Sequence, residues 1–273
     1  MVTNFDELEC ATCLARQAGA LALEHLARGI SVEKKAEDEP VTAADREAND
    51  LIVDGLRRKF GDYGLVSEEA PDDGSRLQKE RVWMVDPIDG TTDFIRGWDG
   101  FSCMIGLLVG DAPALGVVYQ PRGDRLYFAA AGQGAWMQVA DEAPERIAVS
   151  SVDKLEECRL VSSKSHRDAM TEKVRDELRV KDDLAVGSIG LKLGLIARGA
   201  RDLYVNPTGY TKLWDVCGPQ AILHEAGGRL TNVHGAPIHF RGEIANLGGL
   251  IASNRRLHDA AVARLETLFP AGS

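Results

Sequence analysis

The sequence has no apolar run near the roughly 20 residues that a membrane-spanning helix needs. Residues 1–29 carry acidic side chains early and contain no uncharged apolar stretch of secretory length. The five cysteines are scattered and odd in number, which is typical of free thiols rather than of a disulfide framework. We therefore expect a cytoplasmic protein with no membrane partner.

Positive charge is also scarce in this chain. Lysine and arginine number 32 against 42 acidic residues, and the net charge is −10. A phosphate backbone would repel such a chain, so we exclude a general binder of nucleic-acid polymers. An acidic protein still binds a small anionic substrate when metal cations reverse the sign of charge inside the site. The composition therefore directs attention to metal sites.

The order of apolar patterns predicts an α+β protein with two layered sheets and a division near residue 150. Helical spacing predicts helices over residues 5–28, 42–60, 168–178, 188–198, 215–226 and 255–268. Short apolar runs between turn residues predict strands over residues 65–66, 81–85, 101–109, 114–120, 125–130, 134–138, 159–162, 203–205 and 249–253. The strands from residue 101 to 138 should be antiparallel, because their connections are too short for crossover helices.

The segment DPIDGTTDF, residues 86–94, follows a predicted buried strand and carries two acids three residues apart. Gly90 allows a tight turn, after which backbone N–H groups can point toward an anion. Clustered carboxylate oxygens are ligands that suit Mg²⁺. Asp-Gly alone is an ordinary turn signal, and an aspartate before a helix is often an N-cap. Neither alternative requires Asp86 and Asp89 together, with Glu68 and Glu69 after another strand.

Four ordered motifs carry a resemblance over nearly the whole chain: VTAAD (41–45), SEE (67–69), DPIDGTTDF (86–94), and WDVC (214–217) with EAGG (225–228). Together they resemble the signature of the inositol monophosphatase superfamily. The resemblance implies the layered αβαβα sandwich of the inositol monophosphatase / fructose-1,6-bisphosphatase type. It also implies an N-terminal α+β half, residues 1–150, that holds the metal motifs. Residues 151–273 would form an α/β half that supplies Asp215 and substrate contacts.

The family also implies roles for residues at matching positions. The metal ligands would be Glu68, Asp86, the Ile88 carbonyl oxygen, Asp89 and Asp215, holding two or three Mg²⁺ ions. The catalytic residues that orient and activate the attacking water would be Asp45, Thr91 and Glu68. The amides of Gly90 and Thr91 would hold phosphate oxygens. Lithium sensitivity is expected, and the resemblance allows a homodimer.

Structural alternatives accompany these assignments. Asp45 and Asp215 fit helix N-termini, where a carboxylate complements the helix dipole, and this role does not exclude catalysis. Glu69 would either support an outer metal or pair with a base. Glu225 lies at a helix end where its charge opposes the dipole, so we expect a solvent-exposed or ion-paired side chain.

The substrate is expected to be a small phosphorylated molecule, hydrolysed by direct attack of metal-activated water. SKSH (163–166) and WDVCGPQAILH (214–224) resemble 3′(2′),5′-bisphosphate nucleotidases, and Lys164, His166 and Lys212 are their candidate substrate contacts. DGTTDF (89–94) and GGLIASN (248–254) instead resemble inositol phosphatases. We favour the nucleotidase and keep an inositol or related sugar phosphatase as the alternative. A catalytically idle interaction protein is the alternative of another class; it would be expected to have lost one of the metal-site acids.

Overall fold

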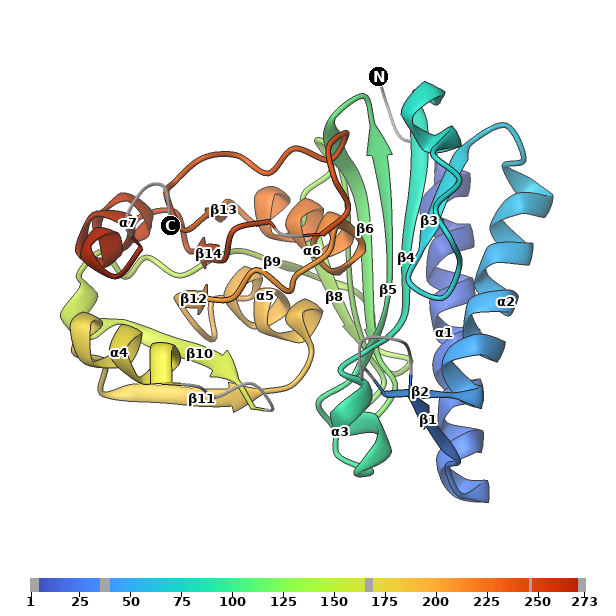
Figure 1. Ribbon diagram of the computed structural model, residues 1–273, viewed down its shortest axis with the longest axis horizontal. Coiled ribbons are helices and arrows are strands. Elements are labelled where there is room, and N and C mark those ends of the chain that lie inside the picture. Colours follow the sequence, from blue (N-terminus) through green and yellow to red (C-terminus); the bar gives the residue numbers. More distant parts are fainter. Residues whose placement is uncertain (1–4, 35–39, 165–168, 246, 270–273) are drawn as a thin grey trace.

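A computed structural model describes residues 5–34, 40–164, 169–245 and 247–269 of the chain. Two large sheets and three layers of helices alternate across the molecule, and a third sheet has only two strands (Figure 1). The expected layered αβαβα architecture is confirmed. Within these described residues, no helix combines the length and the apolar character required to span a bilayer.

The first sheet has seven strands in the order β3-β4-β5-β6-β7-β8-β9. β3 and β4 are parallel, and every later neighbour is antiparallel, as the short connections predict. α1 and α2 pack on one face of this sheet (Figure 1). The bounds are α1 Phe5–Arg28, α2 Ala43–Lys59, β3 Gly64–Ser67, β4 Arg81–Asp89, β5 Ser102–Val109, β6 Ala112–Gln120, β7 Arg125–Ala130, β8 Ala135–Val139 and β9 Glu145–Ile147.

The second sheet has five strands in the order β11-β10-β12-β14-β13. β10 pairs in parallel with β11 and β12, whereas β14 runs antiparallel to β12 and β13. α5 and α6 lie between the two sheets, and α4 and α7 cover the outer face (Figure 1). The bounds are β10 Arg159–Ser163, α4 Ala169–Leu178, β11 Asp182–Val186, α5 Ile189–Ala197, β12 Leu203–Asn206, α6 Leu213–Glu225, β13 Arg229–Asn232, β14 Leu250–Ser253 and α7 His258–Leu265. The predicted division of the chain near residue 150 stays a prediction.

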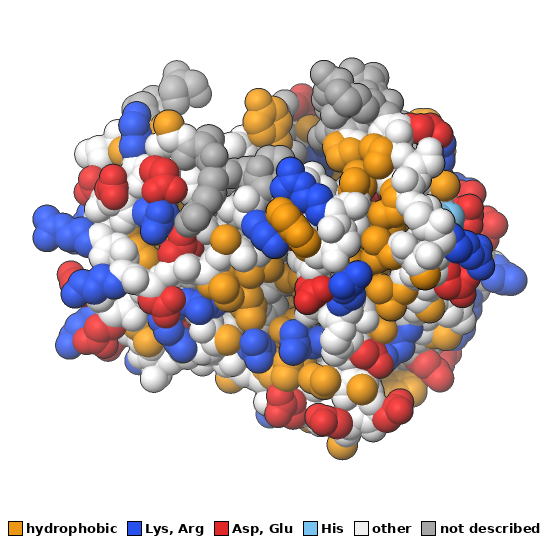
Figure 2. Space-filling model, turned by 90° about the horizontal axis from the view of Figure 1, so that it is seen from below, with side chains coloured by type: hydrophobic (Ala, Val, Ile, Leu, Met, Phe, Trp, Pro, Cys, Tyr) orange, Lys and Arg blue, Asp and Glu red, His pale blue; other side chains and the backbone are white. Residues whose placement is uncertain are grey.

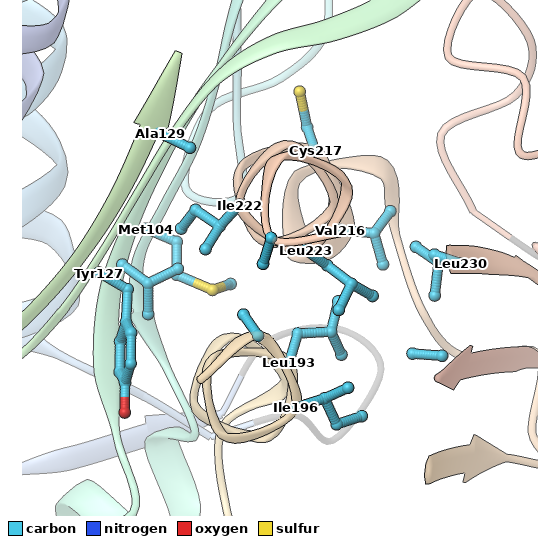
Figure 3. Close-up of a cluster of buried hydrophobic side chains, with 14 of the residues drawn as sticks. Met104, Tyr127, Ala129, Leu193, Ile196, Val216, Cys217, Ile222, Leu223 and Leu230 are labelled. Atoms are coloured by element: carbon cyan, nitrogen blue, oxygen red, sulfur yellow. The ribbon is translucent and has the colours of Figure 1, made fainter. Parts of the chain in front are cut away.

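The central core joins all three inner layers. Met104 and Tyr127 of the first sheet, Leu193 of α5, Leu223 of α6 and Leu230 of the second sheet belong to one buried cluster (Figure 3). α5 and α6 are therefore apolar on more than one side, as expected of helices enclosed between sheets. This enclosure fixes the start of each helix relative to the ends of β3 and β4.

α6 approaches the first sheet closely because glycines meet there. A Cβ on Gly106 would lie 2.6 Å from the Gly218 nitrogen, and a Cβ on Gly116 would collide with the Gly218 carbonyl group. Side chains at these positions would push α6 away from β5 and β6. The close contact holds Asp215, in the first turn of α6, near the acidic end of β4.

Several short elements escaped prediction: β1 (Val32–Lys34), β2 (Pro40–Thr42), α3 (Thr91–Ile95), β9, β11, β13 and the 3₁₀ turns Ser75–Gln78, Leu155–Glu157 and Glu266–Leu268. β11 begins with two aspartates, and α3 has only five residues. Such segments are too short or too polar to show a hydrophobic period. The predicted long helix over residues 5–28 is confirmed at both ends.

Candidate active site

The start of α2 presents Asp45 inside a capping box. The backbone amide and the hydroxyl of Thr42 donate to Asp45 Oδ2 at 2.8 and 2.6 Å, and Asp45 N donates to Thr42 Oγ1 at 3.4 Å. Asp45 is only 1% exposed. Burial raises the pKa of Asp45 to about 6. The hydrogen bonds from Thr42 lower this pKa, whereas repulsion from Glu69 and Glu68 raises it. The carboxyl therefore caps the helix and also faces the acidic groups of the site.

The end of β4 places Asp86 beside Glu68. The amide of Glu68 donates to Val85 O at 3.1 Å, which fixes Glu68 just past β3. Asp86 Oδ1 accepts a bond from Ile88 N at 3.1 Å, where the pairing of β4 with β5 shifts register. Burial raises the pKa of Asp86 well above its usual range, and the charges of Glu68, Asp89 and Asp215 raise it further.

Asp89 is held by residues from the second half of the chain. Ser188 Oγ donates to Asp89 Oδ2 at 2.5 Å, and Gly190 N donates to the same oxygen at 3.0 Å. Ser188 in turn shares a 2.8 Å hydrogen bond with Ser102 of β5. Burial raises the pKa of Asp89, while Lys192 and these two donors oppose that rise. The start of α5 thus orients a carboxylate that belongs to β4.

Asp215 occupies the third position of α6 rather than its N-cap. Lys212 is the N-cap residue, and its backbone N donates to Asp215 Oδ2 at 2.8 Å. Burial raises the pKa of Asp215 well above its usual range, Asp89 and Glu68 add to the rise, and the Lys212 amide opposes it. The structural alternative is correct in part, because the carboxyl does satisfy a backbone donor at the helix start.

The structure therefore brings Glu68, Asp86, Asp89 and Asp215 close enough for their charges to raise the pKa values of the three aspartates. Within residues 5–34, 40–164, 169–245 and 247–269, however, no three acidic, histidine or cysteine side chains already stand at the spacing of a metal site. Each aspartate instead bonds to a nearby protein group. Like charges repel at short range, so closer convergence needs a cation between them. The oxygen donors and their burial fit Mg²⁺ as that cation.

The turn after β4 needs a glycine. Gly90 has φ +92°, and a Cβ there would lie 2.6 Å from Gly100 O. The Thr91 hydroxyl donates to Ile88 O at 3.2 Å. α3 begins at Thr91, so the turn carries the two residues whose amides were predicted to hold phosphate.

The candidate substrate contacts differ in placement. Lys164 Nζ lies 3.9 Å from Asp93 Oδ2 and 3.6 Å from the centroid of the Trp98 ring. Lys212 Nζ lies 5.7 Å from the Trp214 ring centroid, next to Asp215 in the chain. His166 lies outside the described residues.

Lys192 and Ser188 are site residues that the sequence analysis missed. Lys192 is 1% exposed and donates to Val186 O at 3.3 Å and to Gly187 O. Burial lowers the pKa of Lys192 to about 8, while Asp89, Asp93 and Asp215 raise it. The available signal was a single cation inside the otherwise apolar helix IGLKLGLIA.

Glu225 was expected in solvent or in an ion pair; it is partly exposed, but its carboxyl group bonds to two backbone amides. Its two carboxyl oxygens accept hydrogen bonds from Gly132 N at 2.9 Å and Gly134 N at 2.8 Å. These two charge-assisted hydrogen bonds offset the unfavourable interaction of the Glu225 carboxylate with the dipole at the end of α6. It therefore joins α6 to the β7–β8 turn and lies outside the acidic site.

The layered fold and its buried oxygen donors define a phosphoric monoester hydrolase of the metal-dependent class. The family model described as "Inositol monophosphatase family" matches residues 5–268. The chain belongs to the inositol monophosphatase family, whose members depend on metal, typically Mg²⁺.

Individual relatives agree with this assignment. The chain is 35% identical over 239 residues to the 3′(2′),5′-bisphosphate nucleotidase CysQ of Escherichia coli O157:H7, covering 83% of this chain and 91% of the relative. It is 34% identical over 261 residues to a fructose-1,6-bisphosphatase/inositol-1-monophosphatase of Thermotoga maritima, covering 94% of each. A solved Thermotoga maritima IMPase has a TM-score of 0.84 at 30% identity, over 97% of this chain and 98% of that one.

Proposed function

We propose that the protein is a Mg²⁺-dependent 3′(2′),5′-bisphosphate nucleotidase that converts adenosine 3′,5′-bisphosphate to AMP. The observation that carries hydrolysis is the gathering of Glu68, Asp86, Asp89 and Asp215, where burial and mutual repulsion raise the pKa values of the three aspartates. The WDVCGPQAILH segment and the similarity to the CysQ nucleotidase support the choice of substrate.

The chain's own residues divide into three roles in this proposal. Glu68, Asp86, the Ile88 carbonyl oxygen, Asp89 and Asp215 would hold two or three Mg²⁺ ions. When bound, Mg²⁺ would supply water activation and neutralise charge on the phosphate and the leaving oxygen. The Gly90 and Thr91 amides would bind phosphate oxygens, with Glu68 beside the attacking water.

Asp45 and Thr91 would orient that water, and Asp45 would accept its proton. A pKa of about 6 leaves the Asp45 carboxyl ionised at neutral pH yet basic enough to take a proton. The hydrogen bonds from Thr42 hold the carboxyl in a fixed orientation. Proton transfer requires such positioning as well as a suitable pKa.

The test is phosphate release measured with Mg²⁺ from adenosine 3′,5′-bisphosphate and from inositol 1-phosphate. We expect a higher kcat/KM for the nucleotide, loss of activity with EDTA, and recovery when Mg²⁺ is restored. Asp89→Asn should fold normally and be inactive. Wild-type turnover by Asp89→Asn at saturating Mg²⁺ would refute the metal assignment.

An inositol or related sugar phosphatase is the second candidate. The DGTTDF segment and the similarity to the Thermotoga maritima protein favour it. A clear preference for inositol 1-phosphate in the same assay would replace the nucleotidase by this activity and leave the metal site unchanged. Activity that is absent with every ester and with Mg²⁺ present would favour the interaction protein instead. Light scattering would test the homodimer, and lithium titration the expected inhibition.

A further inference from the structure

A cavity of about 390 Å³ lies between the loop that follows α3 and the ends of β10 and β11. Basic and hydrophobic side chains are intermixed near the centre of the lower face of the molecule (Figure 2). The lining residues used below are Asp93, Trp98, Asp99, Lys164 and Gly187. The two halves of the chain thus both contribute to its wall.

Trp98 is an exposed tryptophan that contacts two cations. Its side chain is 37% exposed, the Lys164 ammonium lies 3.6 Å from the ring centroid, and Arg96 Cζ lies 4.8 Å from it. A cation above a tryptophan ring is attracted to its negative face. A free lysine side chain samples many rotamers. An anion that must order this side chain binds with lower affinity, because conformational entropy is lost. Trp98 reduces that loss by holding Lys164 in place beforehand.

Three cations lie in or beside the cavity. Lys164 and Asp93 Oδ2 are 3.9 Å apart, beyond hydrogen-bond length, so this pair leaves ammonium protons able to point into the cavity. Arg122 lies 3.4 Å from Asp99. Lys164 is the cation among the lining residues, beside the carboxylates of Asp93 and Asp99, while Arg96 and Arg122 lie next to the cavity against Trp98 and Asp99. Because Arg122 pairs with Asp99, the Lys164 ammonium is the lining group that can attract an anion.

The cavity adjoins the proposed phosphate site. Asp93 lies in α3, two residues after Thr91, and Gly187 precedes Ser188, which donates to Asp89. A substrate whose reacting phosphate contacts Gly90 and Thr91 can therefore extend toward Lys164. A monophosphate of a neutral polyol has no second charged group to place there.

We propose that Trp98 is a specificity-determining positioning residue, which holds Lys164 to bind the second anionic group of a doubly phosphorylated substrate. The inference rests on the proposed phosphatase reaction and names its substrate class. It assigns the discrimination between bisphosphates and monophosphates to a contact between the two halves of the chain. The competing interpretation is a purely structural Trp98–Lys164 contact, which would affect all substrates alike.

The test compares adenosine 3′,5′-bisphosphate with 3′-AMP, which differ only in the 5′-phosphate. Trp98→Leu should raise KM for the bisphosphate about fivefold, with kcat unchanged and KM for 3′-AMP within twofold of wild type. Trp98→Phe should restore most of the loss. Lys164→Met should raise the same KM, and the double variant should add little to it. Trp136→Leu, in β8, is the matched control and should not change either KM.

Equal changes for both substrates, or no change in Trp98→Leu, would overturn the positioning role. The proposed nucleotidase fails separately, if the wild-type enzyme prefers inositol 1-phosphate. In that event inositol 1,4-bisphosphate and inositol 1-phosphate replace the two nucleotides in the same comparison of variants. A selective rise in KM for the inositol bisphosphate would still support the role of Trp98, and its absence would refute it.

Discussion

Asp202 and Asp86 are equally deep carboxylates in different halves of the molecule, and their surroundings have opposite effects. Asp202 is 0% exposed and accepts bonds from Arg159 Nε at 2.9 Å, Arg159 Nη2 at 2.8 Å and Ser150 Oγ at 2.5 Å. Burial alone would raise its pKa, but these partners outweigh burial and the pKa of Asp202 is lowered. Asp86 is 2% exposed, and burial together with three acidic neighbours raises its pKa.

The difference between Asp202 and Asp86 shows how a carboxylate that stabilises the fold is distinguished from one that can bind a cation. Asp202 has an arginine partner, and this closed network joins β10 to the loop before β12. Asp86 lies among Glu68, Asp89 and Asp215, so its charge is balanced only when a cation enters. Solvent exposure does not separate the two carboxylates, whereas their partners do.

The largest expected effect comes from removing one charge of the acidic cluster. Asp86→Asn should lower kcat/KM by about a thousandfold or more, because a metal ligand is lost. The same variant should melt at a higher temperature than wild type without metal, because repulsion is relieved. Steady-state kinetics and metal-free thermal melting check both parts. A lower metal-free melting temperature would contradict the account of Asp86.

The change of aspartate to asparagine at Asp202 should lower stability and leave activity unchanged, which is the reverse of the effect of Asp86→Asn. Asp202→Asn should reduce the free energy of unfolding by about 2 kcal/mol, because it weakens the charge-assisted hydrogen bonds from the partly exposed Arg159 guanidinium. Its kcat/KM per folded molecule should stay within twofold of wild type. Urea unfolding with active-site titration measures the two quantities. Asp182→Asn, which breaks the more exposed pair with Arg201, is the control and should cost under ~1 kcal/mol.

A smaller effect is expected from His258, a buried base whose ring bonds to two hydroxyl groups. Its ring nitrogens bond to Thr231 Oγ1 and Ser253 Oγ, both at 2.9 Å, and burial lowers its pKa from 6.5 to about 4. The unfolded chain therefore binds the proton first. The contribution of neutral His258 to the free energy of unfolding is fully present above pH 6.5. It is lost as pH falls toward 4, by up to ~1.4 kcal/mol per pH unit.

Urea unfolding of wild type and His258→Asn at pH 7, 5.5 and 4.5 measures this contribution. The variant should be less stable at pH 7 and should lose less stability on acidification. Parallel pH dependence in the two proteins would show that His258 does not titrate in this range. Asp202→Asn offers a second comparison, because a lowered pKa at Asp202 also makes stability fall at acid pH.

Much of the candidate site was predicted from the sequence, through motifs that resemble a family signature. The carboxylates at the ends of predicted strands were identified from DPIDGTTDF and its companion motifs, and the Thr42–Asp45 capping box was visible in four consecutive residues. Lys192 was not found, because a lysine in a helix is ordinarily exposed. The backbone partners of Glu225 were not predicted, because these two amide donors lie 93 and 91 residues away in the chain.

By itself, the sequence determined the long helices, the antiparallel run of strands and the acids that end β3 and β4. These features depend on neighbours a few residues apart, which periodicity and turn chemistry record. Only the tertiary structure decided the partners: Ser188 on Asp89, 99 residues away, and Lys164 on Trp98. Such partners depend on how sheets and helices pack. The charge state of a buried carboxyl follows from those partners, so the chain's local pattern could not supply it.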